Sequence, residues 1–325
     1  MTWVTWRQYR YQGMFAAALF AAVAVVLILT GLHAAWVWHS ALTQCTRNST
    51  CGSLAGSGLS LGSPLAVTLA VDTAAVPLLP GLLWGAPAVA HELETGTHQL
   101  AWTQGISRRH WLAVRTGWLL LAAAVLAGAL SAIVTWWSRP FNALDATAFQ
   151  VNHFDVTGIV PVAYAVFAMA LGISAGTLLR RTLPALAVTL AGFAGVRVFT
   201  ALWLRTRYMT PATVYYKLTA PFTPPGSYLS VRQGFVGPDG KAAALDYAVP
   251  NYNGIPLTVC HQALRNTPDP QAILPCLAAH GYRGYLAYQP ASRFWAFQGI
   301  ETGIFLILAA ALIGIAFWVI RRKDA

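Results

Sequence analysis

The stretch HELETGTHQLAWTQGISRRHWLAVR (residues 91–115) separates two long apolar segments of the chain. It gathers charged and hydrogen-bonding side chains in a sequence that is 57% hydrophobic and 10% charged, with a mean hydropathy of +0.54. Soluble domains carry about 25% charged residues, so this composition is that of a membrane protein. The polar stretch therefore marks a place where the chain leaves the membrane, and the apolar segments around it predict the spans.

Six apolar segments are long enough to cross a bilayer, which takes roughly 20 helical residues. We expect spans near 14–37, 65–90, 112–137, 157–179, 184–204 and 298–320. The first is longer than the apolar core of a cleavable signal peptide, so we interpret it as a retained span. The aromatic and basic stretch 1–12 fits a short helix along the inner surface or an ordinary interfacial flank. The predicted fold class is an all-α membrane protein with six transmembrane helices.

Basic residues in the short loops predict the orientation, because Lys and Arg favour the cytoplasmic side. The net charge of +11 divides between such anchors and the stretch 205–295, so it does not indicate nucleic-acid binding. Both termini are predicted to be cytoplasmic. With the N-terminus inside, the inner segments carry Arg7, Arg10, Arg108, Arg109, Arg115, Arg180, Arg181, Arg321, Arg322 and Lys323, and the short outer loops carry Arg47 and Arg139.

All four cysteines, Cys45, Cys51, Cys260 and Cys276, fall in segments assigned to the outer side. Outer compartments are oxidising, and an even number of cysteines there favours disulfides over free thiols. Neighbouring positions give Cys45–Cys51 and Cys260–Cys276 as the expected pairs, while four cysteines allow three pairings. Neither pair has the close spacing of a zinc site, and we expect no metal.

The stretch 205–295 differs in kind from the spans, since it is rich in proline and tyrosine. TVYYKL (213–218) and SYLSVRQGFV (227–236) look like strands, and GPDG (237–240) is typical of a tight turn. The stretch fits a small folded extracellular domain or an irregular Pro-rich loop. We therefore divide the chain into 1–204, with an interfacial segment and five spans, 205–295 outside, and 296–325, with the sixth span and a basic tail.

The polar stretch contains the signals of a separate short helix. Gly96 ends the incoming helix, and Thr97 can cap a new one over 98–104. Such a helix would lie across the cytoplasmic surface between the second and third spans. It either docks a cytoplasmic partner or forms an amphipathic loop anchored by Trp102 and Trp111.

ELETGTHQLAWTQGISRRHW (92–111) resembles the same segment of permease subunits of type-2 ABC exporters, especially an actinobacterial group. YQPASRFWAFQGIETGIF (288–305) resembles the passage into their last span. The resemblance implies that the short helix is a coupling helix, seated in a groove of a separate ATP-binding subunit. Two such subunits and two permease chains, expected to be a homodimer, would form the transporter. The positions that carry the resemblance are Glu92, Glu94, Gly96, Thr97, Trp102, Thr103, Gln104, Ser107, Arg108 and Trp111.

The chain lacks the Gly-x-x-x-x-Gly-Lys-Ser/Thr loop that binds nucleotide phosphates. HELET (91–95) begins like a zinc-protease helix, but Thr95 stands where the second His is needed. We therefore expect no catalytic residue and no cofactor in this chain, with ATP and Mg²⁺ bound by the partner. The resemblance implies that the function is export of a hydrophobic or amphipathic compound by alternating access in a bacterial cell membrane. The alternative is a membrane sensor or immunity protein that binds an extracellular ligand through 205–295 without an ATPase.

Ionisable residues within the predicted spans indicate a polar site in the membrane domain. Asp72 and Arg197 lie at matched depth, roughly 10 Å below the outer surface, so we expect an ion pair. His33 and Glu301 lie nearer the outer end. The group either lines an outward cavity or is a single structural pair, with Glu301 favoured at a helix N-terminus.

Overall fold

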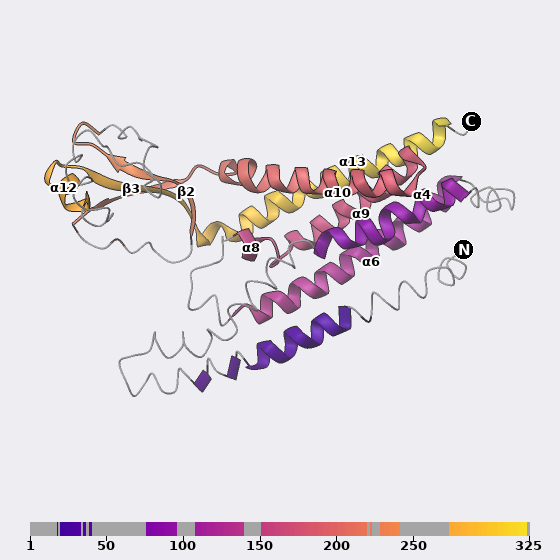
Figure 1. Ribbon diagram of the computed structural model, residues 1–325, viewed down its shortest axis with the longest axis horizontal. Coiled ribbons are helices and arrows are strands. Elements are labelled where there is room, and N and C mark those ends of the chain that lie inside the picture. The colour runs from indigo at the N-terminus through magenta and orange to yellow at the C-terminus, as the bar shows by residue number, and fades with distance from the viewer. Residues whose placement is uncertain are drawn as a thin grey trace. The chain divides into compact units, whose positions relative to one another are not determined.

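The computed structural model describes residues 18, 20–33, 35–36, 39–40, 76–95, 108–139, 151–219, 222, 228–240 and 273–323. The chain divides into two compact units, which we treat separately (Figure 1). The helical unit comprises Met1–Asp145, Gln150–Arg205 and Trp295–Ala325. The sheet unit comprises Ala146–Phe149 and Thr206–Phe294.

Four segments of the described chain are long and apolar enough to cross a membrane: His110–Trp137, Val160–Leu179, Thr182–Arg207 and Ala291–Arg322. They contain the helices α6 (Arg108–Trp137), α9 (Val160–Leu179), α10 (Thr182–Phe199) and α13 (Phe294–Lys323). These segments match the last four predicted spans and make the chain a multi-pass membrane protein. The total of six spans and their orientation stay predictions.

The first two predicted spans are described in part. An apolar helix covers Phe20–His33 and packs through Leu27 against Val134 and Trp137 of α6. The second span includes a 3₁₀ turn (Val76–Leu78), a π-helical turn (Gly81–Gly85) and α4 (Ala86–Thr95). The described helix reaches Thr95, five residues beyond the predicted end of the span at 90, which agrees with the prediction that the incoming helix runs on to Gly96.

The π-helical turn has a sequence cause in Pro87. Proline has no N–H, and its ring crowds the carbonyl four residues earlier, which here belongs to Leu83. The preceding turn widens, and the Ala86 N–H donates to the Gly81 carbonyl, five residues back.

Helix α9 is the centre of the helical unit. In its most apolar window 72% of residues are buried, against 17–28% in the other three candidate spans. Small residues let the second span approach it closely: a Cβ added at Gly81 would lie 2.3 Å from the Ala168 carbonyl oxygen, and one at Gly172 would lie 2.5 Å from the Gly81 oxygen. Such spacing of small residues is how membrane helices pack backbone to backbone.

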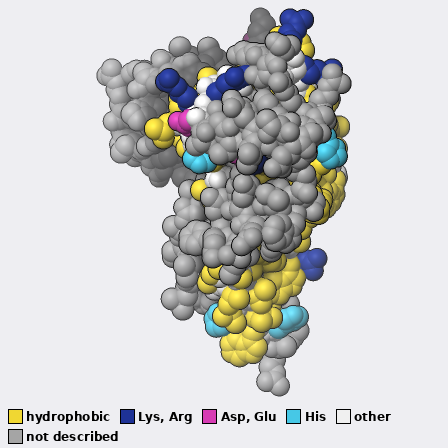
Figure 2. Space-filling view, turned by 90° about the vertical axis from the view of Figure 1, so that its right-hand side faces the viewer, with side chains coloured by type: hydrophobic (Ala, Val, Ile, Leu, Met, Phe, Trp, Pro, Cys, Tyr) yellow, Lys and Arg dark blue, Asp and Glu magenta, His cyan; other side chains and the backbone are white. Residues whose placement is uncertain are grey.

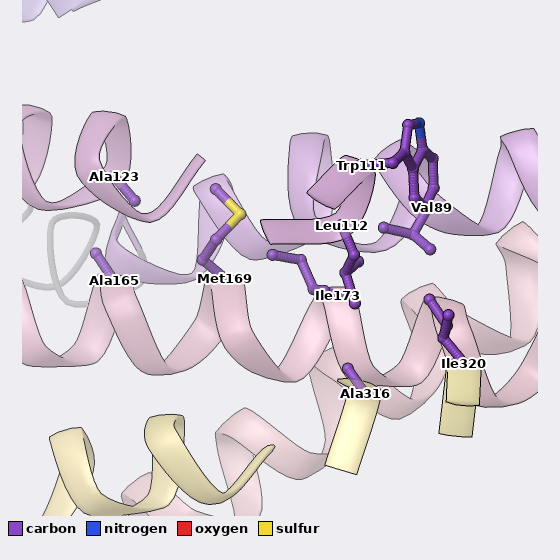
Figure 3. Close-up of a cluster of buried hydrophobic side chains, with 9 residues drawn as sticks. All are labelled: Val89, Trp111, Leu112, Ala123, Ala165, Met169, Ile173, Ala316 and Ile320. Carbon is purple, nitrogen blue, oxygen red and sulfur yellow. The ribbon is translucent and has the colours of Figure 1, made fainter. Parts of the chain in front are cut away.

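A cluster of buried hydrophobic side chains fills the space between α9 and the helices around it (Figure 3). Met169 and Ile173 of α9 lie at its middle, and the Ser174 hydroxyl donates to the Leu312 carbonyl of α13 at 2.7 Å. The members are Val89, Trp111, Leu112, Ala123, Ala165, Met169, Ile173, Ala316 and Ile320.

Helices α9 and α10 are joined by Arg180 and Arg181 alone, which confirms the predicted tight turn. Arg180 takes the left-handed conformation, with φ of 53°, and its N–H donates to the Gly176 carbonyl. Pro184 lies in the first turn of α10, where a missing N–H costs little.

The sheet unit holds three antiparallel strands in the order β1-β3-β2: β1 (Ala212–Lys217), β2 (Tyr228–Val236) and β3 (Arg283–Pro290). The two predicted strands are confirmed as β1 and β2, and the turn after β2 carries the Gly240 N–H to Gly237 carbonyl bond at 3.0 Å. The third strand was not predicted. The all-α fold class was therefore too narrow, and the chain is mostly helical with a small sheet.

One face of this sheet packs on α12 (Ile273–Ala279). Leu277 of α12 is fully buried against Leu218, with Tyr216 and Phe235 around them. Gly284 makes room for this packing, because a Cβ there would lie 2.3 Å from the Tyr216 ring. The alternation along β1 leaves Thr213 and Tyr215 on the opposite, exposed face.

Candidate functional site

Four charged residues from separate parts of the helical unit meet in a buried cluster, which we call the charge cluster: Asp155, Arg197, Arg205 and Glu301. Arg205 donates to both carboxylate oxygens of Glu301, at 3.0 and 2.8 Å, and to Asp155 at 2.5 Å. Arg197 lies 2.8 Å from Asp155 and 3.8 Å from Glu301. The Tyr164 hydroxyl hydrogen-bonds to Glu301 and, at 3.3 Å, to Asp155.

The two arginines reach the cluster together because the helix between them is not regular. In an α-helix of 3.6 residues per turn, positions eight apart differ by about 80° around the axis. Thr200–Leu204 forms a π-helical turn, and the Arg205 N–H donates to the Thr200 carbonyl, five residues back. One extra residue in the turn brings Arg205 to about the same face as Arg197.

Gln298 fixes the beginning of α9 beside the cluster. Its side-chain oxygen accepts from the N–H groups of Ile159 and Val160, each at 3.0 Å. Its NH₂ group donates to the carbonyls of Phe154 and Thr157 at 3.0 and 3.2 Å. A helix of the sixth predicted span thus satisfies the free N–H groups at the start of another helix, deep in the protein.

The charge cluster is buried and electrically balanced. Asp155, Arg205 and Glu301 are at most 2% exposed, and two guanidinium groups face two carboxylates. Burial raises the pKa of Asp155, but Arg205 and Arg197 lower it further, so the net pKa is below its ordinary value. Arg197 also lies over the Tyr164 ring at 3.8 Å, a contact that favours a cation.

His153, close by on α8 (Val151–Phe154), is affected differently. Burial lowers its pKa to about 4, so its imidazole is neutral at pH 7. No set of three or more His, Cys, Asp or Glu side chains that could hold a metal occurs in the described part of the chain. The cluster therefore has the chemistry of a neutral ionic joint between helices.

The sequence anticipated two members of this cluster. Arg197 and Glu301 do come together, and Glu301 is the eighth residue of α13, so it acts through ion pairs and not at the helix N-terminus. Asp72 lies outside the described residues, and its pairing with Arg197 stays a prediction. His33 is exposed and stacks on Trp36, so it is not among the cluster contacts.

Asp155, Arg205 and Tyr164 were missed by sequence reasoning. Asp155 stands two residues before the predicted fourth span, and Arg205 one residue after the fifth. Both residues were therefore assigned to outer loops. Only charges inside the predicted spans were considered as buried, so these two were not recognised. A wider search for opposite charges at matching span ends could have found both.

At the opposite end of the helical unit, the first predicted coupling residues are held by partners within the chain. Glu92 forms an ion pair with Arg115 of α6 at 2.5 Å. Glu94 accepts from the Thr182 N–H at 3.1 Å and from its hydroxyl at 2.8 Å, which caps α10. The hydrogen bonds from Thr182 lower the pKa of Glu94. We call this group, with the α9–α10 turn, the coupling end.

Of the other predicted coupling residues, Arg108 and Trp111 lie among the described residues. Trp111 is only 7% exposed and packs in the core of Figure 3, so its indole contributes to packing within the chain, and its role in coupling stays a prediction. Arg108 begins α6. Gly96, Thr97, Trp102 and Gln104 lie outside the described residues, so the short helix over 98–104 stays a prediction.

Cys276 lies half-buried on α12, beside Leu277. Cys45, Cys51 and Cys260 lie outside the described residues. The disulfide pairing therefore stays a prediction.

The helical unit, with its apolar helices and buried ionic joint, defines a multi-pass membrane protein. The family described as ABC-2 membrane transporter related matches residues 17–205, more than half of the chain, and the chain belongs to this family. Proteins of this family are membrane components of ABC transporters that generally work with an ATP-binding subunit and are not catalytic themselves. The match ends at Arg205, the boundary between the two units. No curated protein and no solved structure matches the chain.

Proposed function

We propose that this chain is the membrane-spanning subunit of an ABC exporter of the type-2 class, from the actinobacterial group. It crosses the bacterial cell membrane six times, with both termini cytoplasmic, and moves a hydrophobic or amphipathic compound by alternating access. Two ATP-binding subunits, which hold ATP and Mg²⁺, and a second copy of the chain complete the transporter. The observation that carries the proposal is the family match over 17–205, which includes the helices of the coupling end.

The contacts at the coupling end support a role in transmitting force. Glu92 ties α4 to α6, and Glu94 ties α4 to the beginning of α10. A displacement of the helix proposed at 98–104 would therefore move three membrane helices together. Figure 2 looks onto this end and shows Lys and Arg side chains beside an acidic side chain, and the exposed Arg181, Arg321 and Arg322 fit a cytoplasmic location.

The charge cluster supports the alternating-access part of the proposal. It joins the beginning of α9, the end of α10 and the first part of α13 at the end away from the coupling end. In our proposal these contacts close the outer end of the transport path. Opening requires Glu301 to separate from Arg205, and water must then hydrate both charges, which makes the joint a two-state element.

We place the sheet unit outside the cell, where the pairs Cys45–Cys51 and Cys260–Cys276 would form disulfides. An oxidising compartment and the packing of Cys276 on α12 in the core of a small unit both favour such a crosslink.

Copurification tests the proposal. The tagged chain would be expressed with its neighbouring genes and purified in detergent. Trp102→Ala with Gln104→Ala alters the proposed coupling helix, and Trp118→Ala removes an exposed indole from the flank of α6 as the matched control. We expect the unaltered chain and the control to retain a subunit with a nucleotide-binding motif and the double variant to lose it. Recovery of a folded chain without any ATP-binding subunit would favour the sensor or immunity alternative, in which the sheet unit binds a ligand.

A further inference from the structure

The exposed face of the sheet unit contains a groove of about 660 Å³, a volume in the range of small-molecule sites. Its lining includes Tyr215 of β1 and Tyr285 of β3, which are directly paired across the strands and have ring centroids 6.5 Å apart. Gly234 of β2 leaves room for the Tyr285 ring, because a Cβ there would lie 3.0 Å from that ring. The two rings therefore form an aromatic surface two strands wide.

Arg232 lies on this face of the sheet next to a β-bulge in β2. The register between β2 and β3 shifts between Ser230 and Arg232, which sets Arg232 opposite Ala287. Bulges often redirect a side chain toward a functional site. Ala287 and Tyr285 lie two residues apart on β3 and so share one face of the sheet, and both line the groove together with Arg232.

The described residues that line the groove carry charge of one sign. Arg207 lines it together with Arg232, and none of the described residues that line it is acidic. Guanidinium groups bind carboxylates and phosphates through paired hydrogen bonds, and tyrosine rings bind flat apolar bodies. A small molecule with both features would match the groove in charge and in shape.

We infer that this groove is a binding site for a soluble small anion with a planar apolar body, whose acidic group lies at Arg232 and Arg207 and whose body lies on Tyr215 and Tyr285. The inference rests on the sheet unit alone. Its outcome is therefore independent of whether an ATP-binding subunit associates with the chain.

The test uses the full chain in nanodiscs of phosphatidylcholine and three probes that share one ring system: 2-naphthoate, neutral 2-naphthamide and cationic 2-naphthylmethylammonium. Saturation-transfer NMR titrations would measure their affinities. We expect the carboxylate to bind most tightly and Arg232→Ala to weaken it about tenfold. Lys217→Ala, which removes an exposed cation of β1 outside the groove, should leave the affinity unchanged.

Two further variants test the charge preference and the aromatic contact separately. Arg232→Glu should reverse the preference in favour of the ammonium probe, and Tyr285→Ala should weaken all three probes. Equal affinity for the carboxylate and the amide, or equal binding by the Arg232 and Lys217 variants, would overturn the site. Displacement of 2-naphthoate by phosphatidylglycerol in the nanodisc would show that a lipid headgroup is the occupant and would overturn the claim of a soluble ligand.

Discussion

Neutralising Glu301 should show how strongly the charge cluster holds the helical unit together. Glu301 is fully buried. It accepts two hydrogen bonds from Arg205 and one from the Tyr164 hydroxyl. In Glu301→Gln, Asp155 alone faces two arginines, so one positive charge remains buried without a partner. Two unit charges about 4 Å apart interact by about 4 kcal/mol at an effective dielectric constant near 20. Breaking a buried ion pair costs about 3–5 kcal/mol, and we expect that loss of unfolding free energy.

Arg205→Met, combined with Glu301→Gln, completes a double-mutant cycle. Arg205→Met alone should cost a similar amount, because Glu301 then loses its main partner. In the double variant the pair of Arg197 and Asp155 remains balanced, so the cost should fall short of the sum by about 2–4 kcal/mol.

The assay is unfolding in mixed micelles with increasing dodecyl sulfate, followed by the fluorescence of the chain's 13 tryptophans. Glu92→Gln serves as the control, since it removes a carboxylate from the opposite end of the helical unit and should add to Glu301→Gln. Additivity of Glu301→Gln and Arg205→Met within about 0.5 kcal/mol would refute the reasoning that the two charges depend on one another.

Three other predictions concern packing, pH and capping. Gly172→Leu should cost at least about 1–3 kcal/mol of unfolding free energy, because its Cβ would meet the backbone of Gly81 and Ala86, whereas Gly314→Leu has nothing within 4 Å and should be tolerated in the same assay. His153 has a folded pKa of about 4, below its ordinary 6.5, so protonation favours unfolding; stability should fall by about 2–3 kcal/mol as pH drops from 6.5 to 4, and His153→Gln should remove that slope in unfolding titrations. Glu94→Ala should speed hydrogen exchange at the start of α10, while Glu94→Gln, which keeps an acceptor for Thr182, should change it less; equal exchange in both variants would count against capping.

The spans could be predicted because hydrophobicity is a local property. Twenty apolar residues in a row have few alternatives to a membrane helix, and the segments around α6, α9 and α10 follow the predicted limits within about three residues. The segment around α13 begins at Ala291, before the predicted start at 298. Local signals also gave the turn at Arg180 and Arg181 and the strands β1 and β2. Glycine also predicted how far the second helix runs, since α4 is helical up to Thr95, directly before Gly96.

The sequence by itself determined that the four described apolar segments are membrane helices, where two of the strands lie, and that charge within the helices requires partners. Tertiary structure decided which partners these are. Arg197 of α10 reaches Asp155 because the segment that follows α8 packs beside α10. Arg205 joins them because the π-helical turn Thr200–Leu204 adds one residue to the helix, which turns Arg205 to the face of Arg197. The physical reason is that a buried charge is stabilised by whichever opposite charge the packing of several helices brings within about 4 Å, and that proximity is set by contacts far apart in the chain.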